Sequence, residues 1–241
     1  MQLVFKTLVS LVALASYVSA MPLAKRAPAT VYSKCKESGT FALTFDDGPY
    51  EFTPKLLKLL NDNDVKATFF INGKNYANVE TDEVNGQSYK DILKQASDAG
   101  HQIGSHTYQH KSLEGLGRSE IEQQMNKNSD VIYDAIGKRP AFMRPPKGEI
   151  DDNALDVLGE LGYRGVIMWD IDSQDWATHN LEKEKIEYNK VLKDGATGHI
   201  ALNHEVYEQT VNELVPWVID ELKDKVKFVT VAECLGMEPY L

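Results

Sequence analysis

The stretch FALTFDDGPY at residues 41–50 joins an apolar run to two carboxylates and a turn. Phe41–Phe45 indicates a buried strand, and the strand ends at Asp46 and Asp47. Neighbours in a strand point to opposite faces, but the following Gly48-Pro49 favours a turn, so Asp47 can share a cavity with Asp46. Two adjacent anions repel each other unless one is protonated or a cation lies between them. A solvated Asp-Gly turn is the alternative that this stretch alone favours.

Short apolar runs and amphipathic stretches alternate along the rest of the chain. Further strands are predicted at 65–71, 101–105, 141–144, 165–169, 199–203 and 227–230. Helices are predicted from Thr53-Pro54, at 91–99 before Gly100, from a Ser119/Glu122 capping box to Gly137, and at 153–161, 181–192 and 210–225, the last with a kink at Pro216. Residues 74–88 are predicted to be a long loop. Seven strands separated by helices indicate an α/β protein whose parallel sheet closes on itself as a barrel rather than an open doubly wound sheet.

Polar residues follow the ends of these predicted strands over some 160 positions of sequence. In barrels of this kind the chemistry is carried by the rim at the carboxyl ends of the strands. We therefore expect these residues to meet in one cleft: Asp46, Asp47, His106, His110, Arg144, Asp175, Trp176 and His204.

A histidine pair in SHTYQH, residues 105–110, could supply the cation that the two aspartates need. His106 and His110 are four residues apart, which on a helical turn places both imidazoles on one side. Such a spacing is common by chance, but with one carboxylate it forms a two-histidine, one-carboxylate set that binds a divalent metal and leaves positions open for water and substrate. The other aspartate then stays free to accept a proton from the water.

The remaining candidates would assist the hydrolysis of an amide. His204 is the candidate acid, because the pKa of histidine lies near working pH, while Arg144 could hold Asp46 ionised and Asp175 could raise the pKa of His204. Trp176 and Leu202 could line a pocket for a methyl group. The alternatives are a structural histidine beside Glu205, a surface ion pair for Arg144, a solvated acidic loop with Asp170, Asp172 and Asp175, and core positions for Trp176 and Leu202.

The first 26 residues are predicted to be removed. Lys6 precedes an apolar stretch too short to span a bilayer, which is typical of a secretory signal at residues 1–20, and the dibasic pair at 25–26 predicts a propeptide at 21–26. Residues 27–241 then suit a single catalytic domain. In a secreted protein Cys35 and Cys234 are expected to form one disulfide, because no CxxC motif or third cysteine supports a zinc or redox role.

The charge balance excludes one class of partner. The chain has 26 Lys and Arg against 36 Asp and Glu, a formal net charge of −10. Loss of the three basic residues among the first 26 leaves −13 for residues 27–241. Such a chain lacks the basic footprint that binds nucleic acid or an anionic membrane. We expect a soluble monomer, secreted to the cell wall or the medium.

Five segments together resemble a known family. TFDDGP at 44–49, SHTYQH at 105–110, RPPKG at 144–148, DSQDW at 172–176 and LNH at 202–204 resemble, in order and spacing, the motifs of the polysaccharide deacetylases. This is the NodB-homology group, carbohydrate esterase family four, and the single-domain layout with terminal cysteines is similar to its fungal chitin-deacetylating members. The resemblance implies an irregular (β/α) barrel, which agrees with the strand count.

The resemblance also implies a role for each matching residue. It makes Asp46 the general base, His204 the general acid, and Asp47, His106 and His110 the ligands of one divalent ion, usually zinc, with Co²⁺ or other divalent ions active in some members. Arg144 would orient Asp46, Asp175 would tune His204, the backbone N–H of Lys147 would hold the oxyanion, and Trp176 and Leu202 would form the acetate-methyl pocket. Lys147 departs from the family pattern, which usually has an aromatic residue there.

The function expected from these residues is removal of N-acetyl groups from N-acetylglucosamine units of chitin or chito-oligosaccharides, giving chitosan and acetate. A peptidoglycan deacetylase or an O-acetyl xylan esterase would use the same mechanism. Two other classes compete: a metal-free glycoside hydrolase with Asp46 and Glu205 as its carboxylate pair, and a non-catalytic chitin-binding protein.

Overall fold

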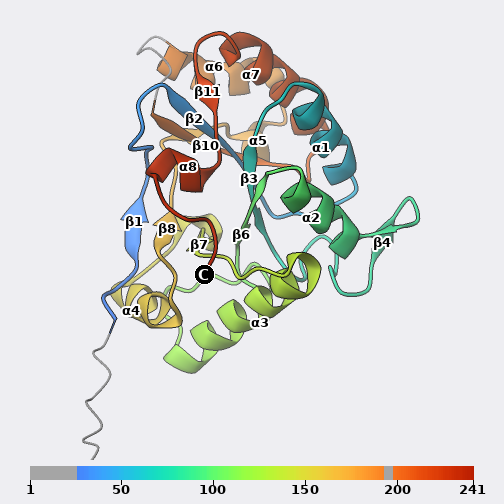
Figure 1. Ribbon diagram of the computed structural model, residues 1–241. Coiled ribbons are helices and arrows are strands. Elements are labelled where there is room, and N and C mark those ends of the chain that lie inside the picture. Colours follow the sequence, from blue (N-terminus) through green and yellow to red (C-terminus); the bar gives the residue numbers. More distant parts are fainter. Residues whose placement is uncertain (1–25, 193–197) are drawn as a thin grey trace, which may run out of the picture.

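A computed structural model describes residues 26–192 and 198–241 (Figure 1). The predicted signal and propeptide lie outside the described residues, except for Arg26. The strands are β1 (Thr30–Tyr32), β2 (Thr40–Asp46), β3 (Ala67–Ile71), β4 (Glu83–Val84), β5 (Gln87–Ser88), β6 (Gln102–Ser105), β7 (Phe142–Met143), β8 (Gly165–Ile167), β9 (Ile171–Asp172), β10 (His199–His204) and β11 (Lys227–Phe228). The helices are α1 (Thr53–Asp62), α2 (Tyr89–Asp98), α3 (Arg118–Ile136), α4 (Asp152–Leu161), α5 (Asp175–Thr178), α6 (Leu181–Leu192), α7 (Val215–Leu222) and α8 (Val231–Leu235), with a 3₁₀ turn at Pro146–Gly148 and a π turn at Thr210–Leu214.

The main sheet is parallel and strongly curled. Its strands follow the order β1-β8-β7-β6-β3-β2-β10-β9, and β11 pairs with β2 as well. Lys34, just after β1, forms a single bridge with His199 at the start of β10, so the curl brings the first strand back toward the other end of the sheet. This arrangement is a half-barrel with helices, which confirms the expected irregular (β/α) fold. Two strands of this main sheet, β1 and β9, were not predicted, because two or three residues carry no periodicity.

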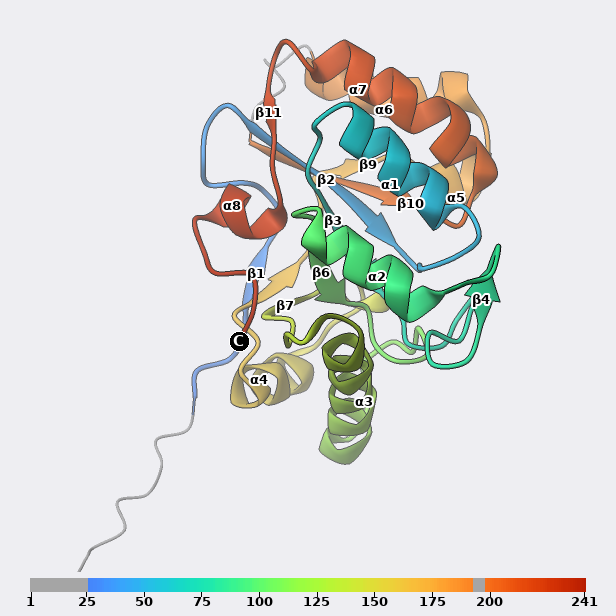
Figure 2. The same cartoon turned by 45° about the vertical axis from the view of Figure 1, so that its right-hand side comes forward.

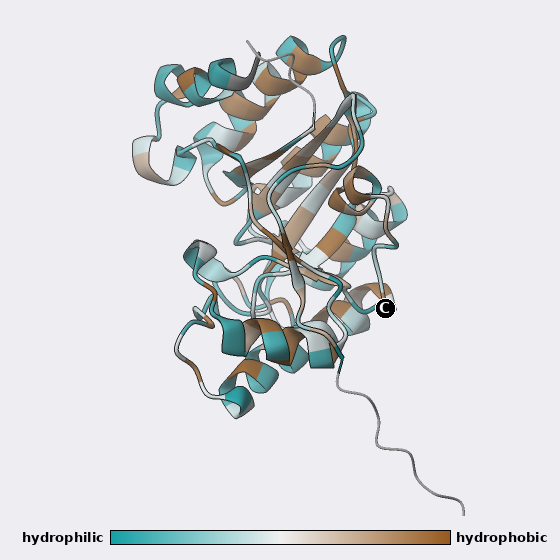
Figure 3. Ribbon diagram, turned by 90° about the vertical axis from the view of Figure 1, so that its left-hand side faces the viewer, coloured by the Kyte–Doolittle hydropathy of each residue, from teal (hydrophilic) through white to brown (hydrophobic). Residues whose placement is uncertain are grey.

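The helices cover the outer side of the sheet. Figure 2 shows α7, α1, α2 and α3 in succession around it, and Figure 3 shows hydrophobic residues along the central strands with hydrophilic ones on outer turns of the helices. Every residue from Phe41 to Asp46 of β2 is buried, as a central parallel strand requires. No helix in the described part of the chain is both long and apolar enough to cross a membrane.

Three local predictions were wrong in detail. Ser119 does not cap α3, because the N-cap position is the extended Gly117, two residues earlier, and Ser119 is the second residue of a helix that begins at Arg118. The predicted 74–88 loop contains the β4–β5 hairpin, whose Asn85-Gly86 turn has positive φ at both positions. The predicted 210–225 helix begins with the π turn and α7 ends at Leu222. Pro216 has no N–H, which explains the widened turn before it.

The expected disulfide is present. Cys35 and Cys234 are bonded across a sequence separation of 199 residues. The backbone N–H of Cys35 donates to Gly198 O, and that of Lys36 donates to Cys234 O. The disulfide therefore joins the segment that follows β1 to helix α8, close to the amino end of β10.

Candidate active site

A cavity of about 860 Å³ lies at the carboxyl ends of the strands. Asp46 is the last residue of β2 and His204 the last of β10, and the two are partners in the parallel register. His106 follows β6 and Arg144 follows β7 in the same way. Six of the eight residues expected to meet in one cleft line this cavity, whereas Arg144 and Asp175 are fully buried and do not line it. The cavity is lined by Asp46, Asp47, Asn75, Tyr76, His106, His110, Lys147, Trp169, Asp172, Trp176, Leu202, His204 and Tyr207.

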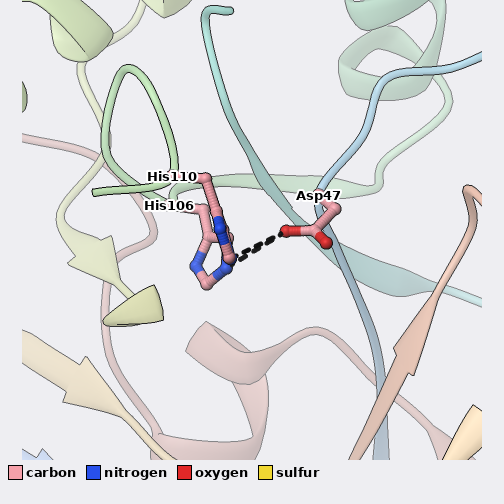
Figure 4. A group of neighbouring side chains, drawn as sticks. All are labelled: Asp47, His106 and His110. Carbon is pink, nitrogen blue, oxygen red and sulfur yellow. Dashed lines mark ion pairs between the residues drawn. The ribbon is translucent and has the colours of Figure 1, made fainter. Parts of the chain in front are cut away.

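Asp47, His106 and His110 form a compact group at this cavity (Figure 4). Asp47 Oδ1 lies 3.5 Å from His106 Nε2 and 3.2 Å from His110 Nε2, and one ligand atom from each residue lies within 4.8 Å of the others. His106 Nδ1 is 2.7 Å from the carbonyl oxygen of Arg144. The bond to a carbonyl requires Nδ1 to carry the proton, which leaves the Nε2 lone pair facing Asp47.

The group fits a divalent cation. Asp47 Oδ1 is buried and has no hydrogen-bond partner among the described residues, although a buried carboxylate oxygen ordinarily has one. Burial raises the pKa of Asp47, but the adjacent imidazole of His106 and the nearby His110 and His204 outweigh it and lower the pKa to about 2. An ionised carboxylate beside two imidazole nitrogens is a donor set for a metal ion.

The backbone conformation that brings His106 and His110 together was not indicated by the sequence. Residues 106–110 are not helical, and Thr107 and His110 have φ of 66° and 53°. Gln109 N–H donates to Gln124 Oε1 of α3, which holds this loop against the helix. The two imidazole rings lie 5.0 Å apart. The predicted pairing is correct, but an irregular left-handed turn produces it rather than a helical turn.

Asp46 is held by a fully buried arginine. Arg144 Nη1 donates to Asp46 Oδ1 over 2.8 Å and to Thr44 Oγ1 over 2.7 Å, while its Nε and Nη2 donate to the carbonyls of Ile167 and Met168. The Arg144 side chain is 0% exposed, so the alternative of a surface ion pair is wrong. Asp46 Oδ2 remains 3.7 Å from His106 Nε2. One oxygen of Asp46 is therefore fixed while the other faces the metal-binding group.

His204 is paired with Asp175 on the other side of the cavity. His204 Nδ1 lies 2.7 Å from Asp175 Oδ1, and Asp175 Oδ2 accepts from His204 N–H and Thr210 Oγ1. Burial lowers the pKa of His204, but the hydrogen bond and charge of Asp175, together with Asp46 and Asp47, raise it to about 9. Asp175 is completely buried, so the alternative of a solvated acidic loop is wrong for this residue. His204 is a protonated acid at neutral pH.

The predicted substrate-binding residues all line the cavity. Leu202 is 4% exposed, whereas Trp176 is 52% exposed and donates from Nε1 to Asp172 Oδ1. Trp176 is therefore not a core residue. Lys147 is exposed and has φ of 60°, which places it at the tip of the turn after Pro145-Pro146.

Sequence reasoning missed an aromatic wall. Tyr76 and Tyr207 line the cavity, the rings of Tyr50 and Tyr76 are 5.4 Å apart, and Tyr207 contacts His204 with ring centroids 5.7 Å apart. Both cavity tyrosines follow strands, β3 and β10, inside polar loops. An aromatic residue in a polar loop at the carboxyl end of a strand was the signal that could have identified them.

Glu205 does not join the cavity. It is 0% exposed, and both carboxyl oxygens are buried without a hydrogen-bond partner in the described part of the chain. Burial raises its pKa well above the ordinary range, and the charges of Asp46 and Asp47 act in the same direction. A glycosidase carboxylate must reach the scissile bond, so this burial speaks against the Asp46 and Glu205 pair of the glycoside hydrolase alternative.

A half-barrel that carries a held carboxylate, a metal-donor triad and a protonated histidine on one rim defines a hydrolase. The model of the family described as polysaccharide deacetylase matches residues 33–166. The chain belongs to the polysaccharide deacetylase family, and is thus a carbohydrate esterase.

Individual relatives agree with this assignment. A chitin deacetylase of Colletotrichum lindemuthianum is 40% identical over 94% of this chain and 92% of its own length. The solved structure of the chitin deacetylase from that fungal pathogen gives a TM-score of 0.80 at 37% identity, covering 88% of this chain and 94% of the other. A peptidoglycan-N-acetylglucosamine deacetylase of Bacillus cereus is 35% identical over 79% of this chain and 66% of its own length.

Proposed function

We propose that the chain removes N-acetyl groups from N-acetylglucosamine units of chitin or chito-oligosaccharides and releases acetate. The observation that carries the proposal is the division of roles between the two adjacent aspartates. Asp47 faces two imidazoles, while Asp46 is held by buried Arg144 beside the same group. The similarity to chitin deacetylases over nearly the whole chain supports the substrate class.

Asp46 is the proposed general base. Its Oδ1 is occupied by Arg144, so Oδ2, on the side of His106, takes the proton of the attacking water. A divalent ion held by Asp47, His106 and His110 would lower the pKa of that water and polarise the acetyl carbonyl. Two histidine nitrogens and one carboxylate oxygen suit zinc, with Co²⁺ or another divalent ion as a substitute.

His204 is the proposed general acid. With its pKa raised to about 9, it carries the proton that the leaving nitrogen needs. Water adds to the amide carbon, the C–N bond breaks, acetate leaves, and the sugar nitrogen departs as an amine. We assign Asp175 to holding the ring and the charge of His204, the backbone N–H of Lys147 to the oxyanion, and Trp176 with Leu202 to the acetyl methyl group.

We also propose that the protein works outside the cell as a monomer, on acetylated polysaccharide of a cell wall. The Cys35–Cys234 disulfide supports an oxidising compartment.

Mass spectrometry of products from acetylated chitin oligomers of defined length tests the proposal. Successive losses of one acetyl group, abolished by a strong chelator and restored by zinc, are expected. Shortened chains that persist in the chelator would contradict it and favour a glycoside hydrolase.

Peptidoglycan is the second candidate substrate, because the Bacillus cereus relative is a peptidoglycan-N-acetylglucosamine deacetylase. Acetate release from chitin oligomers, purified peptidoglycan and acetylated xylan, measured side by side, separates the two candidates and the xylan esterase alternative. Faster release from peptidoglycan or xylan would replace chitin as the proposed substrate.

A further inference from the structure

Glu205 is a fully buried acid that the proposed chemistry does not use. It follows His204 at the end of β10 and is 0% exposed. Burying a carboxyl group without a hydrogen-bond partner is costly, and neither oxygen has one among the residues described. A side chain that bears this cost at the edge of an active site needs an explanation other than stability.

The Glu205 carboxyl lies against the metal-binding turn, residues 47–49, which carries Asp47. A Cβ placed on Gly48 would lie 1.7 Å from Glu205 Oε1 and 2.4 Å from Cδ, so the acid occupies the space beside the glycine. The φ of Gly48 is not in the left-handed region, and its backbone conformation is therefore open to alanine. A side chain directly after Asp47 would therefore have to displace the Glu205 carboxyl, whereas the φ of Gly48 alone would allow one.

The same glycine is held from a second direction, by Asn72. The backbone N–H of Asn72 donates to Gly48 O over 3.0 Å. The side-chain amide of Asn72, which is 1% exposed, donates to the carbonyls of His106 and Thr107 over 2.5 and 2.8 Å. Hydrogen bonds through Asn72 thus connect Gly48 to the segment that carries His106. Gly48 is also the residue that directly follows Asp47 in the chain.

We propose that Glu205 is a positioning residue for the metal-binding turn, packing on Gly48 so that Asp47 stays in register with His106 and His110. The Glu205 carboxyl packs against one side of the turn at Gly48, and Asn72 forms a hydrogen bond to the carbonyl of Gly48. Because Glu205 is adjacent to His204, the same contact fixes the acid relative to the metal donors. This inference rests on the proposed metal binding by the triad.

Zinc affinity of the purified chain, measured by competition with a chromophoric chelator, tests the inference. Glu205→Ala is expected to weaken zinc binding by about 10- to 100-fold, the usual effect of losing an outer support of a metal ligand. Glu205→Gln keeps the shape of the carboxyl group and is expected to bind zinc like the wild type. Gly48→Ala is expected to weaken binding, and adding Glu205→Ala to it should recover part of the loss, because the new methyl group then fills the vacated space.

Glu184 provides the matched control. It is also 0% exposed, and its Oε2 has no hydrogen-bond partner among the described residues, but its Oε1 accepts from Thr178 Oγ1 and from the backbone N–H of Asn180, just before α6. Glu184→Ala should therefore lower the melting temperature without changing zinc affinity. Wild-type zinc affinity in Glu205→Ala or in Gly48→Ala would overturn the inference, and the Gly48→Ala result decides it should Glu205→Ala not fold. A wild-type chain that binds no zinc would instead refute the proposed metal site.

Discussion

The two ends of β10 carry nearly identical histidine–aspartate pairs. At the amino end, His199 Nδ1 lies 2.6 Å from Asp170 Oδ2, and at the carboxyl end, His204 Nδ1 lies 2.7 Å from Asp175 Oδ1. Both histidine side chains are 12% exposed. Pair geometry and burial therefore do not distinguish a catalytic histidine from a structural one.

The neighbours distinguish them. His199 is in register with Phe41, and its carbonyl oxygen lies 3.3 Å from Cys35 Sγ of the disulfide. His204 is in register with Asp46 and lines the cavity. The His199–Asp170 pair lies beside the disulfide. The His204–Asp175 pair lies beside Asp46 and the metal-donor residues. We therefore expect the same dyad to serve structure at one end of the strand and chemistry at the other.

The largest effect should come from replacing Asp46, the carboxylate that lies beside the dyad at the carboxyl end of β10 and has no counterpart beside His199 in the register with β2. Asp46→Asn removes the base but leaves the triad, so we expect kcat to fall by about 10³- to 10⁴-fold with zinc still near one per chain. His106→Ala should lose both activity and zinc, because it removes a ligand. Metal analysis of each purified variant beside its kinetics checks this. Zinc loss in Asp46→Asn would mean that the roles of the two aspartates are misassigned.

Substituting each histidine of the two dyads tests the comparison directly. His204→Gln should lower kcat by about 10²- to 10³-fold, because the leaving nitrogen loses its proton donor. His199→Gln should leave kcat near wild type and lower the melting temperature. Kinetics with a chitin oligomer and thermal unfolding of both variants measure the two effects. Equal losses of kcat would show that the ends do not differ in function.

The two aspartates of the dyads should differ in their effect on the pH profile. The pKa of His204 is raised to about 9 by Asp175, so the acid stays protonated below that pH and activity should fall as pH rises through it. Asp175→Asn removes the charge that raises the pKa, and the alkaline limb should move down toward about 6.5, the ordinary value for histidine. Asp170→Asn should leave the limb unchanged. The pH dependence of kcat for both variants provides the measurement.

The sequence predicted the members of this site better than their geometry. A strand ending in Asp46 and Asp47 and a histidine at the end of β10 could be placed, because parallel strands bring their carboxyl ends to one rim. The left-handed turn that pairs His106 with His110 could not, because positive φ at a histidine leaves no mark in the sequence. The burial of Glu205, which the glycoside hydrolase alternative needed in the cavity, could not be predicted for a related reason. Which face a residue takes after a strand ends is decided by tertiary packing, here against Gly48.

The amino end of β10 offers a smaller effect, on stability alone. Replacing Cys35 and Cys234 with alanine opens a loop of 199 residues, for which chain entropy predicts a loss of about 5 kcal/mol as an upper figure. We expect a lower melting temperature with kcat and zinc affinity unchanged, since the disulfide lies at the end away from the cavity. Thermal unfolding and kinetics below the transition check this. A drop in kcat at temperatures below the unfolding transition would show that the disulfide end of β10 influences the active-site end.

The smallest effect is expected at the carboxyl-end rim, where Lys147 places a cation on the cavity wall. Deacetylated sugar units are themselves cationic, so repulsion by Lys147 should disfavour binding of partly deacetylated chains. Lys147→Tyr removes that charge and should change the order in which the acetyl groups of a defined oligomer are lost, with only a small change in the rate of the first loss. Mass spectrometric sequencing of the products follows that order. A product pattern identical to that of the wild type would mean that the ammonium group does not reach the bound sugar.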